Sequence, residues 1–238
     1  MFTDKIDLDS FDKIDPEYKE LLGRVLTIQA DCEIGGPHLY VDDMLPGAPT
    51  KLEQLIVART AAEEMDHYRK IAYLAGQIGV DVSYVLSWPN RKRYLDAFRG
   101  VIKTWEDFAV FGFLIDRVGK YQLEEFLDCS YVPLQEILPQ ILKEEHGHIS
   151  YGTAKSEELA DKGDEEKERL QAAVEFWYPK ALDMFGRSES KRSERYIFWG
   201  LKRRTNAQAR EEYMKEVNPI IQKMDLTVPD PLKHRAYL

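Results

Sequence analysis

The sequence predicts an all-α fold in which one domain forms a helical bundle. Apolar residues recur at three- and four-residue spacings over long segments, many of these segments open with a helix cap, and alternating strand patterns are missing. The 238 residues are 44% hydrophobic and 32% charged, which is an ordinary composition for a globular chain with a real core. We expect a single domain over residues 1–238, with a core bundle over about 16–162, C-terminal helices over about 164–222 and an extended tail over 223–238.

Each predicted helix begins at a cap and ends at a turn signal. Asp15, followed by proline, predicts the N-cap of a first helix that Gly35-Gly36-Pro37 ends or bends. Thr50 opens a capping box, Thr104 resembles another cap, and Ser130 is the expected cap of a fourth helix. The predicted helices run over about residues 16–35, 51–79, 105–128, 131–162, 164–186, 190–203 and 206–222, with a long crossover at roughly 80–103.

Two Glu-x-x-His motifs interrupt helix faces that are otherwise apolar or small. Glu64 and His67 form the first motif, and Glu145 and His148 form the second. Residues three apart on a helix point to the same side, so each pair can place a carboxylate oxygen and an imidazole nitrogen on one metal ion. Charged groups are rarely buried unless they are paired or coordinate a metal, and the two motifs therefore predict a metal site.

The two helices that precede these motifs each supply a further carboxylate on the matching face. Glu33 lies 31 residues before Glu64, and Asp116 lies 29 residues before Glu145. The midpoint of each interval falls on a turn signal, so the members of each pair should lie level in an antiparallel hairpin. Two such hairpins joined by a crossover make the ferritin-like four-helix bundle of dinuclear iron and manganese carboxylate proteins. Glu124 and Glu125 are alternatives to Asp116 whose spacing would not place them level with the site.

Charge supports a site with two ions. Four carboxylates and two neutral imidazoles balance two divalent cations, and a neutral group is what a buried environment tolerates. Oxygen and imidazole ligands suit iron or manganese, so the residues predict two divalent ions of one of these metals. Gln29 lies one turn before Glu33 and either hydrogen-bonds a ligand carboxylate or is an ordinary polar group at the bundle end. Glu63, Glu144 and His146 are expected off the core face.

Glycine flanks Asp116 on both sides of the same helix face. Gly112 and Gly119 either leave space beside the metals or allow two helices to pack closely, and the second interpretation is favoured.

The overall composition excludes several classes of protein. A net charge of −9 argues against a nucleic-acid partner, because polyphosphate needs a basic surface. No stretch of about 18 apolar residues is present, so we expect no membrane span. The N-terminal residues lack a signal-peptide pattern, and only two cysteines occur, so the expected location is the cytoplasm.

The sequence resembles the catalytic (A) subunits of bacterial multicomponent phenylacetyl-CoA epoxidases over roughly residues 16–234. The motifs that carry the resemblance are Cys32–Gly35, Ala48–Thr50, Glu63–His67, Leu114–Asp116, Lys143–His148, Phe176–Pro179, Met184–Gly186, Leu201–Asn206 and Thr227–Pro231. The resemblance implies that two irons are held by the residues that match the family's ligands. These are Glu33, Glu64, His67, Asp116, Glu145 and His148.

The resemblance also implies an activity and its partners. The expected activity is that of a di-iron monooxygenase, which activates O₂ and epoxidises the ring of an aromatic acyl-CoA such as phenylacetyl-CoA. Electrons would come from a separate flavin and iron–sulfur reductase. The chain would pair with a related, metal-free helical subunit or form a homo-oligomer.

A basic segment is the candidate contact for the CoA phosphates. Lys202, Arg203 and Arg204 precede Asn206 at a predicted helix start, and cations and helix N-termini both favour phosphate. The alternative is an ordinary solvated group of cations near a helix C-terminus.

Two other functional classes stay open on the residues alone. One is a different dimetal carboxylate protein, such as a ferroxidase or a manganese catalase. The other is a non-catalytic structural partner subunit, whose mark would be the loss of the metal ligands; all six candidate ligands are present in this chain.

Overall fold

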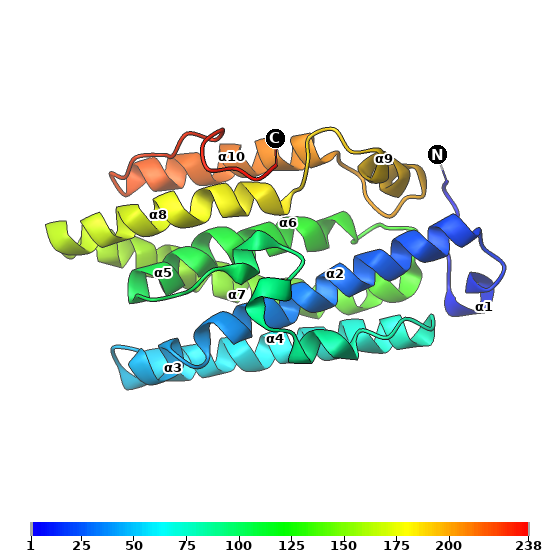
Figure 1. Ribbon diagram of the computed structural model, residues 1–238, viewed down its shortest axis with the longest axis horizontal. Coiled ribbons are helices and arrows are strands. Elements are labelled where there is room, and N and C mark those ends of the chain that lie inside the picture. The colour runs from blue at the N-terminus through cyan, green and yellow to red at the C-terminus, as the bar shows by residue number, and fades with distance from the viewer. Residues whose placement is uncertain (1, 238) are drawn as a thin grey trace.

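The computed structural model describes residues 2–237, and every regular element in that range is a helix (Figure 1). The prediction of an all-α bundle is therefore confirmed. The α-helices are α1 (Leu8–Phe11), α2 (Pro16–Tyr40), α3 (Met44–Gly47), α4 (Lys51–Gln77), α5 (Trp105–Val110), α6 (Arg117–Glu125), α7 (Val132–Ala160), α8 (Asp164–Met184), α9 (Lys191–Phe198) and α10 (Asn206–Lys223). Three short 3₁₀ helices cross over between α4 and α5, namely η1 (Ser83–Ser87), η2 (Asn90–Lys92) and η3 (Asp96–Arg99).

Four long rods form the bundle. A π-helical turn, η4 (Phe111–Asp116), joins α5 to α6, so that these three elements act as one rod. This rod packs along α7, α2 packs along α4, and α4 also contacts α7. Figure 1 shows α8 and α10 along one side of the bundle and α4 along the opposite side. The two hairpins predicted from the sequence are thus present.

The apolar core consists of two buried clusters at different levels of the bundle. On α4, Val57 belongs to one cluster and Ile71 to the other, with Glu64 and His67 between them. On α7, Leu159 and Ile141 occupy the two clusters in the same way, and Glu145 and His148 separate them. Apolar packing above and below therefore holds the polar motifs at one level.

Most helix starts lie where the caps predict. The Asp15 carboxylate accepts a hydrogen bond from the Glu17 amide at 2.8 Å, and the Thr50 hydroxyl accepts one from the Glu53 amide at 3.2 Å. A third cap, Thr104, forms the predicted box at the start of α5. Local chemistry therefore settles where these helices begin.

Three predicted boundaries were wrong, two of them at residues that make tertiary contacts and one at a glycine with a positive φ. The first helix continues through Gly35 to Tyr40 instead of ending near Gly35. Glycine is needed at position 35 because the helix backbone lies close to Phe98: a Cβ there would lie 2.5 Å from the Phe98 ring. Ser130 does not cap α7, since its hydroxyl pairs with the Tyr18 hydroxyl at 3.0 Å. Helix α9 ends at Phe198, just before Gly200, which has a φ of +67°.

The crossover is tied to α2 by a buried ion pair. Arg93 donates to the Asp31 carboxylate at 2.8 Å and to the Val85 carbonyl at 2.9 Å, and both charged side chains are fully buried. The second Asp31 oxygen accepts a hydrogen bond from the Tyr94 amide at 2.8 Å. This network holds a segment of little regular structure against the bundle.

Across residues 2–237, the helices are all too short or too polar to span a lipid bilayer.

Candidate metal centre

Three helices bring four predicted ligands together in the middle of the bundle. Glu33 comes from α2, Glu64 and His67 come from α4, and Glu145 comes from α7; each offers one ligand atom within 4.8 Å of the others, and all four side chains are buried. The level predicted from hairpin spacing is therefore the level at which they meet. Such a group of oxygen and nitrogen donors could hold a metal ion.

Both histidines turn the same ring nitrogen toward the carboxylates. The His67 Nδ1 atom lies 3.3 Å from a Glu33 oxygen and 3.5 Å from a Glu145 oxygen. The His148 Nδ1 atom lies 3.2 Å from a Glu64 oxygen and 4.0 Å from a Glu145 oxygen. Among the described residues, His148 Nδ1 has no hydrogen-bond partner although it is buried. A buried, unpartnered nitrogen aimed at carboxylates fits a cation between them.

Asp116 reaches the same centre from the fourth rod. It lines a small cavity of about 30 Å³ together with Glu33, Glu64 and Glu145, although it lies outside the tight group of four. Burial, followed by the negative charge of Glu145, raises the pKa of Asp116 to about 8. Glu125 instead pairs with Arg204 on another face of α6, which removes it as an alternative ligand.

The carboxylates repel one another in a dry environment. Burial raises the pKa of Glu64, and the charges of Glu145, Glu33 and Asp116 raise it further. Burial also opposes ionisation of Glu33, but hydrogen bonding and charge from His67, with a smaller contribution from Gln29, outweigh burial and lower its pKa. Positive charge beside these groups would relieve the repulsion, so the electrostatics of the cluster fit a bound cation.

Gln29 supports the cluster from within α2. Its side-chain amide donates to a Glu33 oxygen at 2.5 Å, and both residues are buried. Of the two interpretations available from the sequence, the structure favours the hydrogen bond to a candidate ligand.

Two glutamates that were expected off the core face contact the site from outside. The outer nitrogen of His67 lies 2.9 Å from a Glu144 oxygen, and the outer nitrogen of His148 lies 2.9 Å from a Glu63 oxygen. Each glutamate thus contacts the histidine of the opposite helix, and each glutamate side chain is only 18% exposed. The sequence-based expectation missed this role, although a second glutamate directly precedes each Glu-x-x-His motif and was a usable signal. His146 does point away, and its Nδ1 lies 2.6 Å from the Leu142 carbonyl.

The π-helical turn decides where Asp116 lies, and glycines let α7 approach it. A Cβ on Gly112 would lie 3.3 Å from the Gly152 Cα and 3.5 Å from the His148 carbonyl, so Gly112 allows close helix packing, as favoured from the sequence. Gly119 faces the small cavity, where a Cβ would be 3.9 Å from a Glu145 oxygen. π-Helical turns occur often at functional sites, and this one carries a candidate ligand.

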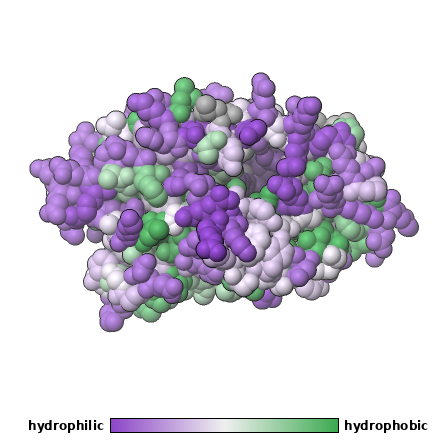
Figure 2. Space-filling model, in the orientation of Figure 1, coloured by the Kyte–Doolittle hydropathy of each residue, from purple (hydrophilic) through white to green (hydrophobic). Residues whose placement is uncertain are grey.

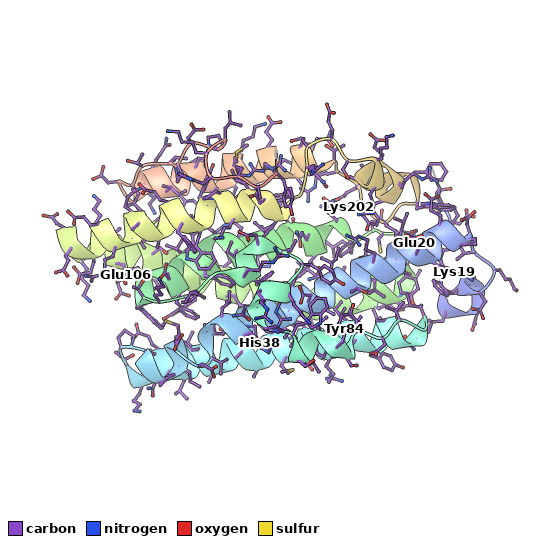
Figure 3. All side chains as sticks on the ribbon, in the orientation of Figure 1. Lys19, Glu20, His38, Tyr84, Glu106 and Lys202 are labelled. Carbon is purple, nitrogen blue, oxygen red and sulfur yellow. The ribbon has the colours of Figure 1, made fainter. Side chains whose placement is uncertain are left out.

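A larger cavity of about 260 Å³ adjoins the small one. The two share Gln29, Gln122 and Met184 as lining residues. Apolar and aromatic side chains line much of the larger cavity, including Val25, Ile28, Leu95, Tyr121, Phe126 and Phe185. Figure 2 shows a hollow on this face of the molecule, in the region where Figure 3 labels Lys202.

The basic segment that was predicted to bind CoA is divided among three environments. Lys202 and Asn206 line the larger cavity, and the Lys202 ammonium donates to the Asn206 side chain at 3.1 Å. Arg203 lines a neighbouring cavity of about 350 Å³. Arg204 is engaged with Glu125 and Glu212. Arg24 and Arg192, which no sequence motif indicated, join Lys202 around the larger cavity.

The structure thus defines an all-α bundle protein with a buried cluster of glutamates and histidines that could hold metal between its two hairpins. The chain belongs to the family described as phenylacetic acid catabolic protein, whose profile matches residues 9–236. This confirms the resemblance noted from the motifs.

Two curated relatives are similar to the chain over most of its length. In Escherichia coli (strain K12), the subunit designated A of the 1,2-phenylacetyl-CoA epoxidase is 29% identical over 222 residues, which cover 91% of this chain and 71% of that protein. Component B of the benzoyl-CoA oxygenase of Aromatoleum evansii is 25% identical over 228 residues, which cover 82% of this chain and 47% of that protein. The chain therefore spans about half the length of the second relative.

Proposed function

We propose that this protein is the oxygenase subunit of a multicomponent enzyme that oxidises the ring of an aromatic acyl-CoA. The observation that carries the proposal is the buried cluster of glutamates and histidines at the centre of a bundle of this family. Both relatives act on aromatic acyl-CoA thioesters by their names, one as an epoxidase and the other as an oxygenase. Epoxidation of phenylacetyl-CoA is the specific reaction we propose.

Two iron ions are the proposed cofactor. Their ligands would be the residues whose atoms converge on the cluster or line the small cavity around it, namely Glu33, Glu64, His67, Asp116, Glu145 and His148. Four carboxylates and two neutral imidazoles match the charge of two divalent ions and suit iron or manganese. Iron held there would supply the reduction of O₂ and the transfer of one oxygen atom to the ring, the other leaving as water.

The chain itself supplies positioning and a dry environment. The apolar clusters above and below the ligands limit the access of bulk water to the site. The cavity of about 260 Å³ would take the acyl arm, with Lys202, Arg24 and Arg192 near the CoA phosphates. Both relatives are named as parts of larger enzymes, which supports partner subunits here, and a separate electron donor is part of the proposal.

The first test measures metal content and oxygen consumption together. The purified protein should contain two iron atoms per chain and should consume O₂ only when a reductant and phenylacetyl-CoA are both present. Glu64→Ala and Glu145→Ala should each lose most of the iron, because each removes a buried carboxylate from the cluster. Glu136→Gln, an exposed change on α7, serves as the control and should keep full iron content.

The result can contradict the proposal in three ways. Equal iron content in wild type and the three variants would show that Glu64 and Glu145 do not hold the iron. Disproportionation of peroxide without any reductant would favour a catalase, and oxidation of added ferrous iron without a need for the thioester would favour a ferroxidase.

Glu63→Gln and Glu144→Gln should weaken metal binding while leaving the fold intact. Each glutamate accepts the outer N–H of a candidate ligand histidine, and removal of such a partner costs about 10–100-fold in metal affinity. Competition with a chelator measures the affinity, and the absorption spectrum of the loaded protein reports the change in the histidine. Retention of the wild-type affinity by both variants would show that the two contacts play no part in holding the metal.

A further inference from the structure

Three residues belong to the walls of both cavities and mark the boundary between them. Gln29, Gln122 and Met184 line both the cavity of about 30 Å³ beside the carboxylates and the cavity of about 260 Å³ next to it. The small cavity holds at most one or two water molecules, whereas a cavity of about 150 Å³ is known to hold benzene. An aromatic ring therefore fits in the larger cavity, and these three residues lie between that cavity and the one beside the carboxylates.

Hydrogen bonds hold two of the three side chains in place. Gln29 donates to Glu33 at 2.5 Å, and Gln122 donates to the backbone carbonyl of Met184 at 3.1 Å. Both amides therefore have a partner that would be lost if they swung aside.

The backbone at Met184 is also held, which leaves its side chain as the part that can move. The preceding residue, Asp183, pairs with Arg235 at 2.5 Å and accepts the Ala236 amide at 2.6 Å. The Leu182 carbonyl accepts a hydrogen bond from Arg210 at 3.1 Å. The methionine side chain is unbranched, with three rotatable bonds, and is itself buried. It adapts to an apolar neighbour at little cost in conformational energy.

We propose that the Met184 side chain is the specificity-determining residue at this boundary. It sets how large an aromatic acyl group can approach the carboxylate cluster from the larger cavity. The inference rests on the proposed function, because it takes the aromatic acyl-CoA as the occupant of the larger cavity. A shorter side chain at position 184 joins the two cavities and admits a wider ring, whereas the contacts to the CoA part of the ligand stay as they are.

The test compares two thioesters that differ only in the ring. Calorimetry on the metal-loaded protein without reductant measures the Kd of phenylacetyl-CoA, of 2-naphthylacetyl-CoA and of free CoA. In Met184→Ala the ratio of the naphthyl Kd to the phenyl Kd should fall about tenfold or more, the effect expected when a pocket changes by a few methylene groups. The Kd of free CoA should stay within twofold of wild type.

Two further variants keep the test decisive. Met65→Ala changes a methionine on the exposed surface of α4 and should leave the ratio unchanged. Met184→Val keeps an apolar side chain that is shorter than methionine, so it should shift the ratio of the two Kd values in the same direction as Met184→Ala. It replaces Met184→Ala if thermal unfolding shows that the alanine variant does not fold. A ratio equal to that of wild type in the folded variants would overturn the role of Met184. If wild type binds phenylacetyl-CoA no better than free CoA, the proposed function fails instead.

Discussion

Gly152→Ala should destabilise the bundle by about 3 kcal/mol and release metal from the site, although it adds only one methyl group. A Cβ at this position would lie 2.5 Å from the Phe113 amide nitrogen, 2.6 Å from the Gly112 carbonyl carbon and 2.9 Å from the Ala109 carbonyl oxygen. All three atoms are backbone, so no side chain can rotate to make room, and the rod formed by α5, η4 and α6 must move away from α7. Because that rod carries Asp116, the displacement also separates a proposed ligand from the others.

Denaturant unfolding and metal analysis measure the two effects. Gly147→Ala is the matched control on the same helix, since a Cβ there meets nothing within 4 Å. Alanine at an open helical position is expected to be neutral or to stabilise the helix by up to about 1 kcal/mol. If both variants unfold at the same denaturant concentration and hold the same amount of iron, the close approach of α7 to the π-helical turn is not needed for either property.

Arg93→Met should cost about 3–5 kcal/mol of stability, because it leaves the Asp31 carboxylate buried without its cation. Both members of this pair are fully buried, and Arg93 also donates to the Val85 carbonyl. Loss of the pair frees the crossover from α2. The crossover contributes Phe98 to the small cavity beside the proposed ligands, so the lining of that cavity should change as well.

The double variant Arg93→Met, Asp31→Asn separates the loss of packing from the penalty of a buried charge. It should recover a large part of the lost stability, since neither position 93 nor position 31 then carries a buried charge. Lys215→Met breaks the exposed pair with Glu211 and should change the free energy of unfolding by less than about 0.5 kcal/mol. If Arg93→Met and Lys215→Met lower the free energy of unfolding by equal amounts, the buried pair does not anchor the crossover.

Several features of this protein were predictable because they are local. Caps such as Asp15, Thr50 and Thr104 satisfy amides within their own first turn, so neighbouring residues are enough to place a helix start. The two Glu-x-x-His motifs obey helix periodicity, and the intervals between carboxylates follow from hairpin geometry. For that reason the spacing alone predicts one level for four ligands that do meet, namely Glu33, Glu64, His67 and Glu145.

Other features depend on residues that are distant in the sequence. Nothing local shows that Gly35 faces Phe98, and the predicted end of the first helix at that glycine was wrong for this reason. Similarly, the bonds from Glu63 to His148 and from Glu144 to His67 run between two helices that are about 80 residues apart in the chain. Helix periodicity predicts which face of its helix a residue occupies, but it does not predict which side chain of another helix that residue contacts.

The sequence by itself determined the helical class, the order of the elements and the residue types able to bind a metal, because helix periodicity and capping act over a few residues. Only the tertiary structure decided the π-helical turn that carries Asp116, the cavity bounded by Met184 and the burial of Arg93 against Asp31. These depend on how closely whole helices approach one another, and that distance results from packing across the entire bundle.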